Sequence, residues 1–95
     1  MKDLQQLRVE IDAVDRELIR LFAQRMDLCG QVAQYKAAQG MAIYAPQREA
    51  QVLEALADRT SPEMLPYTRR LFQVLMDLSK EYQRALLGGD PGTQL

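Results

Sequence analysis

Residues 3–39 read DLQQLRVEIDAVDRELIRLFAQRMDLCGQVAQYKAAQ and contain no proline. Apolar side chains recur along this stretch at intervals of three and four, the spacing of one buried stripe on an α-helix: Leu4, Leu7, Ile11, Val14, Leu18, Leu21, Leu28 and Val32. Asp3 is suited to cap the N-terminus of such a helix, and Gly40 to end it. The stretch therefore predicts one helix of about 36 residues, roughly 54 Å long at 1.5 Å per residue.

A helix of that length does not fit inside a compact monomer of this chain. The protein has 95 residues, enough for one small domain. Such a domain has a radius of gyration of about 12–13 Å, and the helix would project about 20 Å beyond it. Because the apolar stripe continues to the far end, we expect a second copy of the chain to cover it in an intertwined homodimer. The alternative is a helix broken near Gly30 into a hairpin.

Two shorter helices are expected after the long one. Pro46 is favourable in a first turn and opens a helix that runs to about Asp58. Pro62 and Pro66 make the residues between them a separate turn, so a third helix is expected from near Pro66 to Leu87. Its apolar face is expected at Leu71, Phe72, Leu75, Leu78, Tyr82 and Leu86.

The ends and the composition define the class of protein. The glycine-rich residues 88–95 are expected to be a disordered tail, which leaves residues 1–87 as one all-α domain of three helices. With 12 basic and 13 acidic residues, the chain lacks the charge of a nucleic-acid binder. It has neither the apolar run of a membrane span nor the apolar core of a signal peptide near its start, so we expect a cytoplasmic protein without a membrane partner.

The inventory of reactive side chains excludes several kinds of catalysis. The chain has no histidine, which rules out a Ser-His-Asp triad and a histidine-bound metal. Its single cysteine, Cys29, forms neither an internal disulfide nor a cysteine cluster for zinc.

Two cations interrupt the apolar stripe of the long helix. Continuing the spacing from Leu21 reaches Arg25, at a position that the pattern assigns to the interior. Lys36 follows eleven residues later, within about 20° of the same face and about 16 Å along the axis. Two such cations can hold an anion between them, and Arg8 borders the stripe where an antiparallel partner could bring it near Arg25. The ordinary interpretation is that these side chains reach solvent or pair with carboxylates.

Four further polar residues are candidates for the same site. Arg48 and Glu49 follow the Pro46 turn, although a glutamate in a first turn also simply suits the helix dipole. Ser79 and Gln83 are four residues apart on the third helix and share a face beside its apolar stripe. Taken alone, this pair fits a solvated helix flank equally well.

Together these residues resemble the all-helical class of chorismate mutases over nearly the whole chain up to Leu87. The resemblance is carried by four segments in order: Leu7-Arg8-x-x-Ile11-Asp12-x-x-Asp15-x-x-Leu18-x-x-Leu21-x-x-x-Arg25-Met26, Val32-x-x-Tyr35-Lys36, Ile43-Tyr44-x-Pro46-x-Arg48-Glu49, and Leu71-Phe72-x-x-Leu75 with Ser79 and Gln83. It implies three helices per chain, two interlocked chains whose long first helices span the dimer, and two active sites.

The resemblance also implies a role for each polar residue. Arg25 and the partner subunit's Arg8 would pair with the two substrate carboxylates. Lys36 and Gln83 would donate hydrogen bonds to the ether oxygen of the breaking bond, so that Arg25, Lys36 and Gln83 are the catalytic set. Glu49 would hold the ring hydroxyl. The rest of the polar lining would come from Arg48 and Ser79.

The implied reaction is the unimolecular [3,3] rearrangement of chorismate to prephenate, in phenylalanine and tyrosine biosynthesis. It needs the substrate held in a chair-like shape, with negative charge stabilised on the ether oxygen as the C–O bond breaks. It needs no nucleophile, metal or general base, so no cofactor is expected. The expected partners are this small dianionic substrate and a second copy of the chain.

One departure from the family pattern leaves the substrate open. The family usually has Tyr-Asp-Pro at the loop-to-helix junction, whereas this chain has Tyr44-Ala45-Pro46. An isochorismate-pyruvate lyase or a 4-amino-4-deoxychorismate mutase on the same fold is therefore an alternative. A non-catalytic helical dimer, such as an adaptor, is another, although an adaptor has no need for the inward Arg25 and Lys36.

Overall fold

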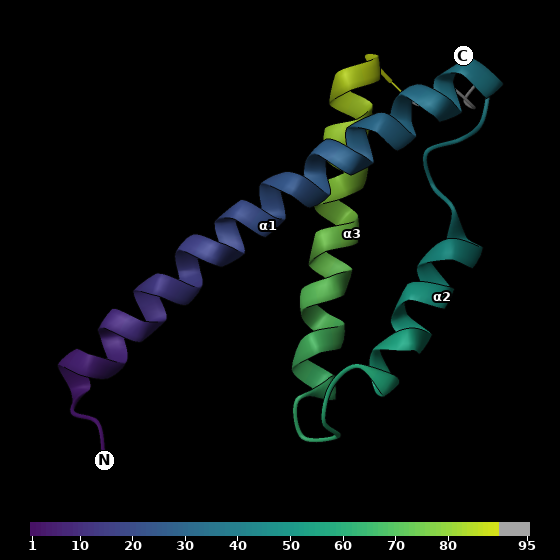
Figure 1. The fold of residues 1–95 in the computed structure, drawn as a ribbon. Helices are drawn as coiled ribbons and strands as arrows, with labels where there is room; N and C mark the ends of the chain where they lie inside the picture. The colour runs from purple at the N-terminus through teal and green to yellow at the C-terminus, as the bar shows by residue number, and fades with distance from the viewer. Residues whose placement is uncertain (90–95) are drawn as a thin grey trace.

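The computed structural model describes residues 1–89, which form three α-helices and one short 3-10 helix (Figure 1). These elements are α1 (Leu4–Gln39), α2 (Pro46–Ala55), η1 (Leu56–Asp58) and α3 (Leu65–Leu87). The predicted all-α fold with a long first helix is confirmed, and α3 begins one residue before the expected Pro66. Of the expected tail, residues 90–95 lie outside the described residues.

Local hydrogen bonds fix both ends of α1. The side chain of Asp3 accepts from the Gln6 backbone N–H at 2.8 Å, and the Gln6 side chain accepts from the Asp3 N–H at 2.9 Å. This reciprocal capping box starts the helix. At the other end Gly40 has a φ of +65°, a conformation that favours glycine, and the N–H of Met41 donates to Lys36 O at 2.8 Å.

Gly30 lies inside α1 and is a packing position rather than a break. It is buried, and a Cβ atom added to it would lie 3.1 Å from Leu86 Cδ1 and 3.5 Å from Tyr82 Cε2 of α3. The absence of a side chain therefore lets α1 and α3 approach closely here. The alternative of a hairpin broken near Gly30 is wrong.

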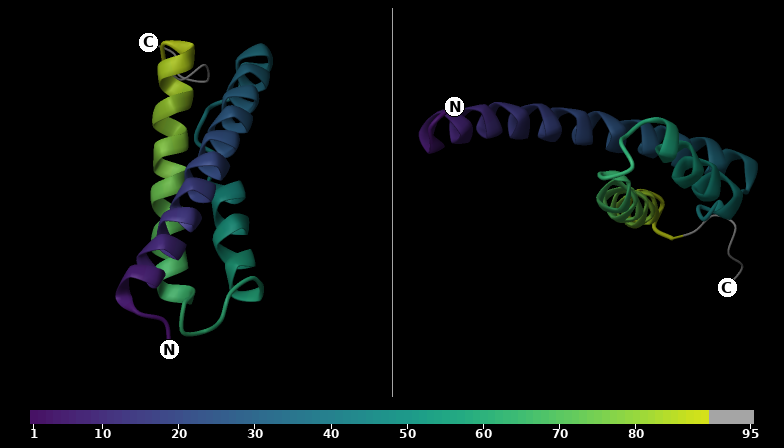
Figure 2. Two further views of the ribbon diagram at one scale, coloured as in Figure 1. Left: turned by 60° about the vertical axis from the view of Figure 1, so that its left-hand side comes forward. Right: turned by 90° about the horizontal axis from the view of Figure 1, so that it is seen from below.

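The helices are arranged around α3. Both α1 and α2 pack against α3, whereas within residues 1–89 no Cα atom of α1 lies within 8 Å of one in α2. Figure 2 shows α2 and α3 beside the C-terminal part of α1, with the N-terminal part extending well beyond them. The buried apolar residues are few, and they come from α1, the loop before α2, η1 and α3: Ala33, Ile43, Leu56 and Met76.

The buried face of α3 is not the one that its leucine pattern predicts. Met76, Ser79 and Gln83 are its buried residues. Of the expected apolar face, Phe72 and Leu75 are partly buried, and the remaining four are exposed: Leu71, Leu78, Tyr82 and Leu86. The buried side chains line a cavity between the helices, and most of the apolar stripe lies beside that face without a cover within the chain.

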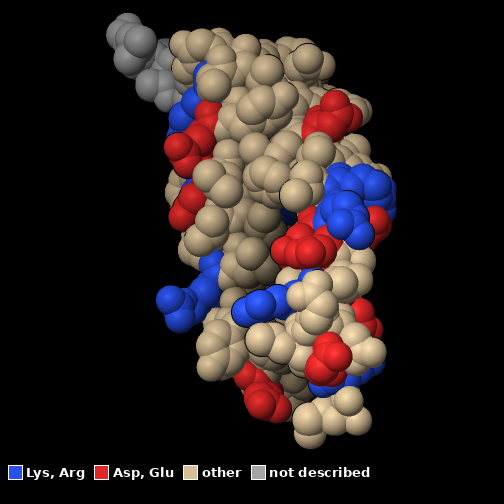
Figure 3. Space-filling view, turned by 90° about the vertical axis from the view of Figure 1, so that its left-hand side faces the viewer, with Lys and Arg blue, Asp and Glu red and all other residues tan. Residues whose placement is uncertain are grey.

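The N-terminal part of α1 has no cover within the chain. Every residue from 1 to 24 is exposed, including the apolar stripe. The molecule measures 59 × 26 × 18 Å, with a Cα radius of gyration of 16.9 Å. It exposes 7491 Å², about 1,900 Å² more than a compact protein of this mass. Figure 3 shows a broad uncharged surface on this side, with most charged side chains beside it.

Candidate active site

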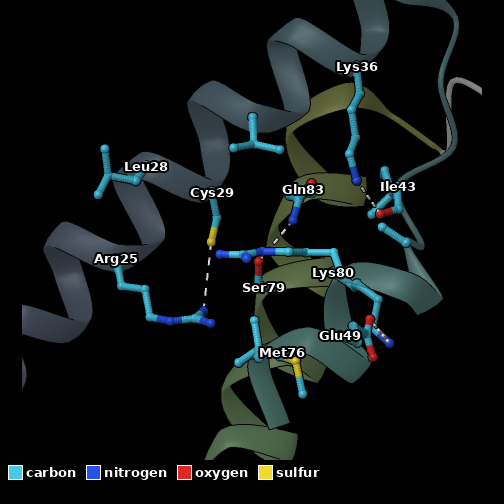
Figure 4. Close-up of a pocket in the computed structure, with 14 residues that line it drawn as sticks. Arg25, Leu28, Cys29, Lys36, Ile43, Glu49, Met76, Ser79, Lys80 and Gln83 are labelled. Carbon is cyan, nitrogen blue, oxygen red and sulfur yellow. Dashed lines mark hydrogen bonds and ion pairs between the residues drawn. The ribbon is translucent and has the colours of Figure 1, made fainter. Parts of the chain in front are cut away.

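A cavity of about 300 Å³ lies between the C-terminal part of α1, the junction into α2, and α3 (Figure 4). The structure brings six of the seven predicted site residues to its wall: Arg25, Lys36, Arg48, Glu49, Ser79 and Gln83. The remainder of the wall is mostly apolar, with Leu28, Val32 and Val52 among its members. A largely apolar cavity with a few convergent polar groups is the usual form of a small-molecule site.

Helix α1 supplies two cations to the cavity, three turns apart. The guanidinium of Arg25 is partly buried, and its Nη1 atom lies 3.8 Å from Cys29 Sγ, one turn further along. The Lys36 ammonium donates to the backbone carbonyl of Ile43 at 2.7 Å. That bond draws the loop before α2 against α1 and leaves two of the three ammonium protons for other acceptors.

Helix α3 supplies two buried polar side chains. Ser79 is 5% exposed and Gln83 is 6% exposed. Gln83 Nε2 donates to Ser79 Oγ at 2.9 Å, while Gln83 Oε1 is buried without a hydrogen-bond partner in the described residues. A buried acceptor without a partner costs free energy, so Gln83 Oε1 favours a ligand group that donates a hydrogen bond.

Sequence reasoning missed Lys80, which also lines the cavity. Its ammonium lies 3.0 Å from the carboxylate of Glu49, and both side chains are about four-fifths buried. Its spacing from residues 76 and 83 places it with them on one face of α3, but the spacing alone does not tell that this face borders the cavity. Cys29 was also missed, although it lies one turn after Arg25 on the same face of α1.

The cavity carries an excess of positive charge. Arg25, Lys36 and Arg48 form no ion pair with any of the residues 1–89. The carboxylate of Glu49 is already paired with Lys80. Arg48 is exposed to water, but Arg25 and Lys36 are partly buried, so their unpaired charges favour an anion in the cavity. No three His, Cys, Asp or Glu side chains in the described part of the chain lie close enough together to hold a metal ion.

Arg8 is the one predicted site residue that the single chain does not bring to the cavity. It is exposed on the uncovered part of α1. Because it precedes Arg25 by seventeen residues in a continuous helix, the two lie about 25 Å apart along the axis. Arg8 can therefore reach such a cavity only in a second copy of the chain.

Comparison with known proteins agrees with this arrangement. The family model for chorismate mutase type II matches residues 7–84, which is most of the chain. The chain belongs to the type II chorismate mutase family. The all-α fold expected from the resemblance is the fold observed, and the six candidate residues that meet at the cavity lie within the matched segment.

Several curated proteins are similar to this type II chorismate mutase domain. The T-protein of Haemophilus influenzae is 53% identical over 55 residues, covering 58% of this chain and 15% of that protein. The bifunctional chorismate mutase/prephenate dehydratase of Enterobacter agglomerans is 40% identical over 83 residues, covering 85% and 21%. The protein of the same name from Aquifex aeolicus is 28% identical over 98 residues, covering 93% and 27%. The chain thus spans only a minor part of each relative's length.

None of the helices in residues 1–89 is long and apolar enough to cross a membrane. The site and the uncovered apolar surface are both carried by α1, at different points along its length.

Proposed function

We propose that the chain catalyses the rearrangement of chorismate to prephenate, as a homodimer with two shared active sites. The observation that carries the proposal is the cavity with its three unpaired cations, in a chain of the type II chorismate mutase family. A dianionic substrate compensates those charges. We retain the cytoplasmic location expected from the sequence, since the lone Cys29 gives the fold no internal disulfide to depend on.

The uncovered part of α1 supports the dimer. The surface in excess of a compact monomer is about 1,900 Å² per chain, which is the scale of an obligate interface. An antiparallel two-fold pairing places the exposed apolar stripe of one α1 against the other chain. It also carries the partner subunit's Arg8 towards Arg25, which completes a pair of guanidinium groups for two carboxylates.

The first task of the site is to hold a flexible substrate in its reactive shape. Arg25 and the partner subunit's Arg8 each bind a carboxylate, and the planar guanidinium makes two parallel hydrogen bonds that fix its direction. Ser79 Oγ, which accepts from Gln83, keeps its own proton to donate to the substrate. Arg48 lies at the exposed edge of the cavity and adds positive charge where the substrate enters.

The second task is to stabilise negative charge on the ether oxygen as its bond to carbon breaks. Lys36 has two ammonium protons that are not used by Ile43, and Gln83 has one amide proton that is not used by Ser79. Both donors are fixed before the reaction, so they stabilise the transition state without reorganising. No proton is transferred, and the bonds made and broken belong to the substrate alone.

The direct test is to follow the disappearance of chorismate absorbance and to identify the product by chromatography. Prephenate is the expected product, and its formation should need only the purified chain. If chorismate is not consumed, the proposed substrate is wrong.

Isochorismate is the second candidate substrate, and a specific observation favours testing it. Ala45 lines the cavity at the position where the family pattern has an aspartate, so this wall lacks one carboxylate. A chain that releases pyruvate from isochorismate and leaves chorismate unchanged is an isochorismate-pyruvate lyase. Inertness towards chorismate, isochorismate and 4-amino-4-deoxychorismate, with a dimer in solution, would favour a non-catalytic role.

A further inference from the structure

Among the described residues of the cavity wall, Lys80 is the charged side chain to which the proposed reaction gives no task. Its side chain is 18% exposed and lies 3.0 Å from Glu49, which is 19% exposed. Asp77 is a second carboxylate within reach, at 3.6 Å, but it is 55% exposed. Because water screens the Asp77 pair more strongly, Glu49 is the main partner of Lys80.

The Lys80 ammonium is also held from a third side. It lies 4.8 Å from the centroid of the Tyr44 ring, within range of a cation–π contact. Tyr44 belongs to the loop before α2, and Glu49 to the first turn of α2. Lys80 therefore ties this loop and helix to α3, and the two charges stay together.

This pairing sets the charge at one end of the cavity. Glu49 is the only carboxylate among the described residues of the wall, since Ala45 stands where the family pattern has an aspartate. Its charge is balanced by Lys80 before any substrate arrives. A hydroxyl group can donate to the carboxylate while the ammonium remains in place. An ammonium group would instead bring a second cation to a carboxylate that is already neutralised, which is unfavourable.

We propose that Lys80 makes this site select a substrate with an uncharged hydroxyl, rather than an amino group, on the ring carbon that faces Glu49. The inference rests on the proposed function, which places that ring substituent against Glu49. Lys80 is a positioning residue here, since it acts through Glu49 and takes no part in bond making. Chorismate is then accepted, and 4-amino-4-deoxychorismate is rejected.

The test compares kcat/KM for chorismate and for 4-amino-4-deoxychorismate in the wild type and in Lys80→Met. The wild type should strongly prefer chorismate. In Lys80→Met the unpaired Glu49 can bind an ammonium, so the ratio of kcat/KM for the amino substrate to that for chorismate should rise about tenfold. Lys80→Arg keeps the cation and should keep the wild-type ratio.

Arg84→Met is the matched control. It removes the same charge from the same helix, one turn further along, at a residue that forms no ion pair with Glu49 within residues 1–89. Its ratio should equal that of the wild type. An unchanged ratio in Lys80→Met, or an equal rise in Arg84→Met, would overturn the inference.

Binding separates this inference from the proposed function. Calorimetry with an inert bicyclic dicarboxylate that bears a hydroxyl, and with its amine counterpart, measures the same preference without turnover. A hydroxyl preference lost in Lys80→Met, together with no conversion of chorismate, upholds the inference and contradicts the proposed activity. If the wild type converts chorismate but binds both ligands equally, the proposed activity is upheld and the inference about Lys80 is contradicted.

Discussion

Residues 4–24 and residues 25–39 of α1 carry the same apolar spacing but differ in what lies beside them. In the second segment Gly30 is buried against α3, while the stripe residues Leu28 and Val32 line the cavity and remain about half exposed. In the first segment every residue is exposed. One apolar spacing along one helix thus borders the cavity and α3 in one segment and has no cover within the chain in the other.

The largest expected effect concerns the segment that borders the cavity. Arg25→Ala and Lys36→Ala should each lower kcat/KM for chorismate by about three orders of magnitude, because each removes a charge to which the proposed function assigns the substrate or its transition state. The dimer should survive both changes, which sedimentation can check. A loss of less than tenfold in both variants would contradict the assigned roles.

In the exposed segment, residues 4–24, a substitution should instead act on dimer formation and stability. Leu18→Asp puts a charge into the uncovered apolar stripe, and we expect a loss of dimer and of about 3 kcal/mol or more in stability. Arg16→Asp, on the other side of α1, should leave the dimer intact. Sedimentation and denaturant titration measure both effects. A wild-type chain that is folded and monomeric would contradict the proposed dimer.

A complementation experiment tests whether Arg8 of one chain and Arg25 of the other form one active site. Arg8→Ala and Arg25→Ala should each be nearly inactive alone. Mixed dimers of the two contain one intact site, so refolding equal amounts together should restore about a quarter of wild-type activity. If the activity of the mixture is only the average of the two variants, the sites are not shared between chains.

A smaller effect is expected at the contact between α1 and α3. Gly30→Ala gains helix propensity, and its new Cβ meets Leu86, an exposed side chain with room to yield. We expect stability to rise by about 0.5 kcal/mol or less in a denaturant titration. Gly30→Leu should destabilise the chain, because no such small shift accommodates it. Destabilisation by Gly30→Ala of about 1 kcal/mol or more would show that Leu86 cannot move.

The smallest effect expected is that of pH. The chain has no histidine, and the amide of Gln83 does not titrate. Turnover of chorismate should therefore change by less than about threefold between pH 6 and pH 8. A steep loss of kcat over that range would count against Gln83 as a donor to the ether oxygen.

The helices were predictable because their signals are local. Asp3, Gly40 and Pro46 mark boundaries that depend only on the neighbouring backbone, and the structure places the boundaries there. The face that α3 buries was not predictable in the same way. Its leucines indicate an apolar stripe, but the burial of Ser79 and Gln83 depends on where α1 and α2 lie.

The site residues likewise divide into those that local spacing predicts and those that depend on tertiary packing. Arg25 and Lys36 could be found because each stands out from an apolar stripe. Lys80 could not be found that way, because charged residues are ordinary on a helix beside a polar flank. Its role depends on the contact with Glu49, which lies thirty-one residues earlier in the chain. Pairings across such a separation are fixed by tertiary packing and not by local spacing.

The exposed half of α1 also bears on how the protein comes to be folded. The capping box at Asp3 lets α1 begin to form from its own residues, before α3 has been synthesised. In the proposed dimer, however, its last partner arrives by collision with another chain, so completing the fold is a second-order process. The time a new molecule waits, and its exposure to proteases while it waits, are then set by how many copies the cell makes.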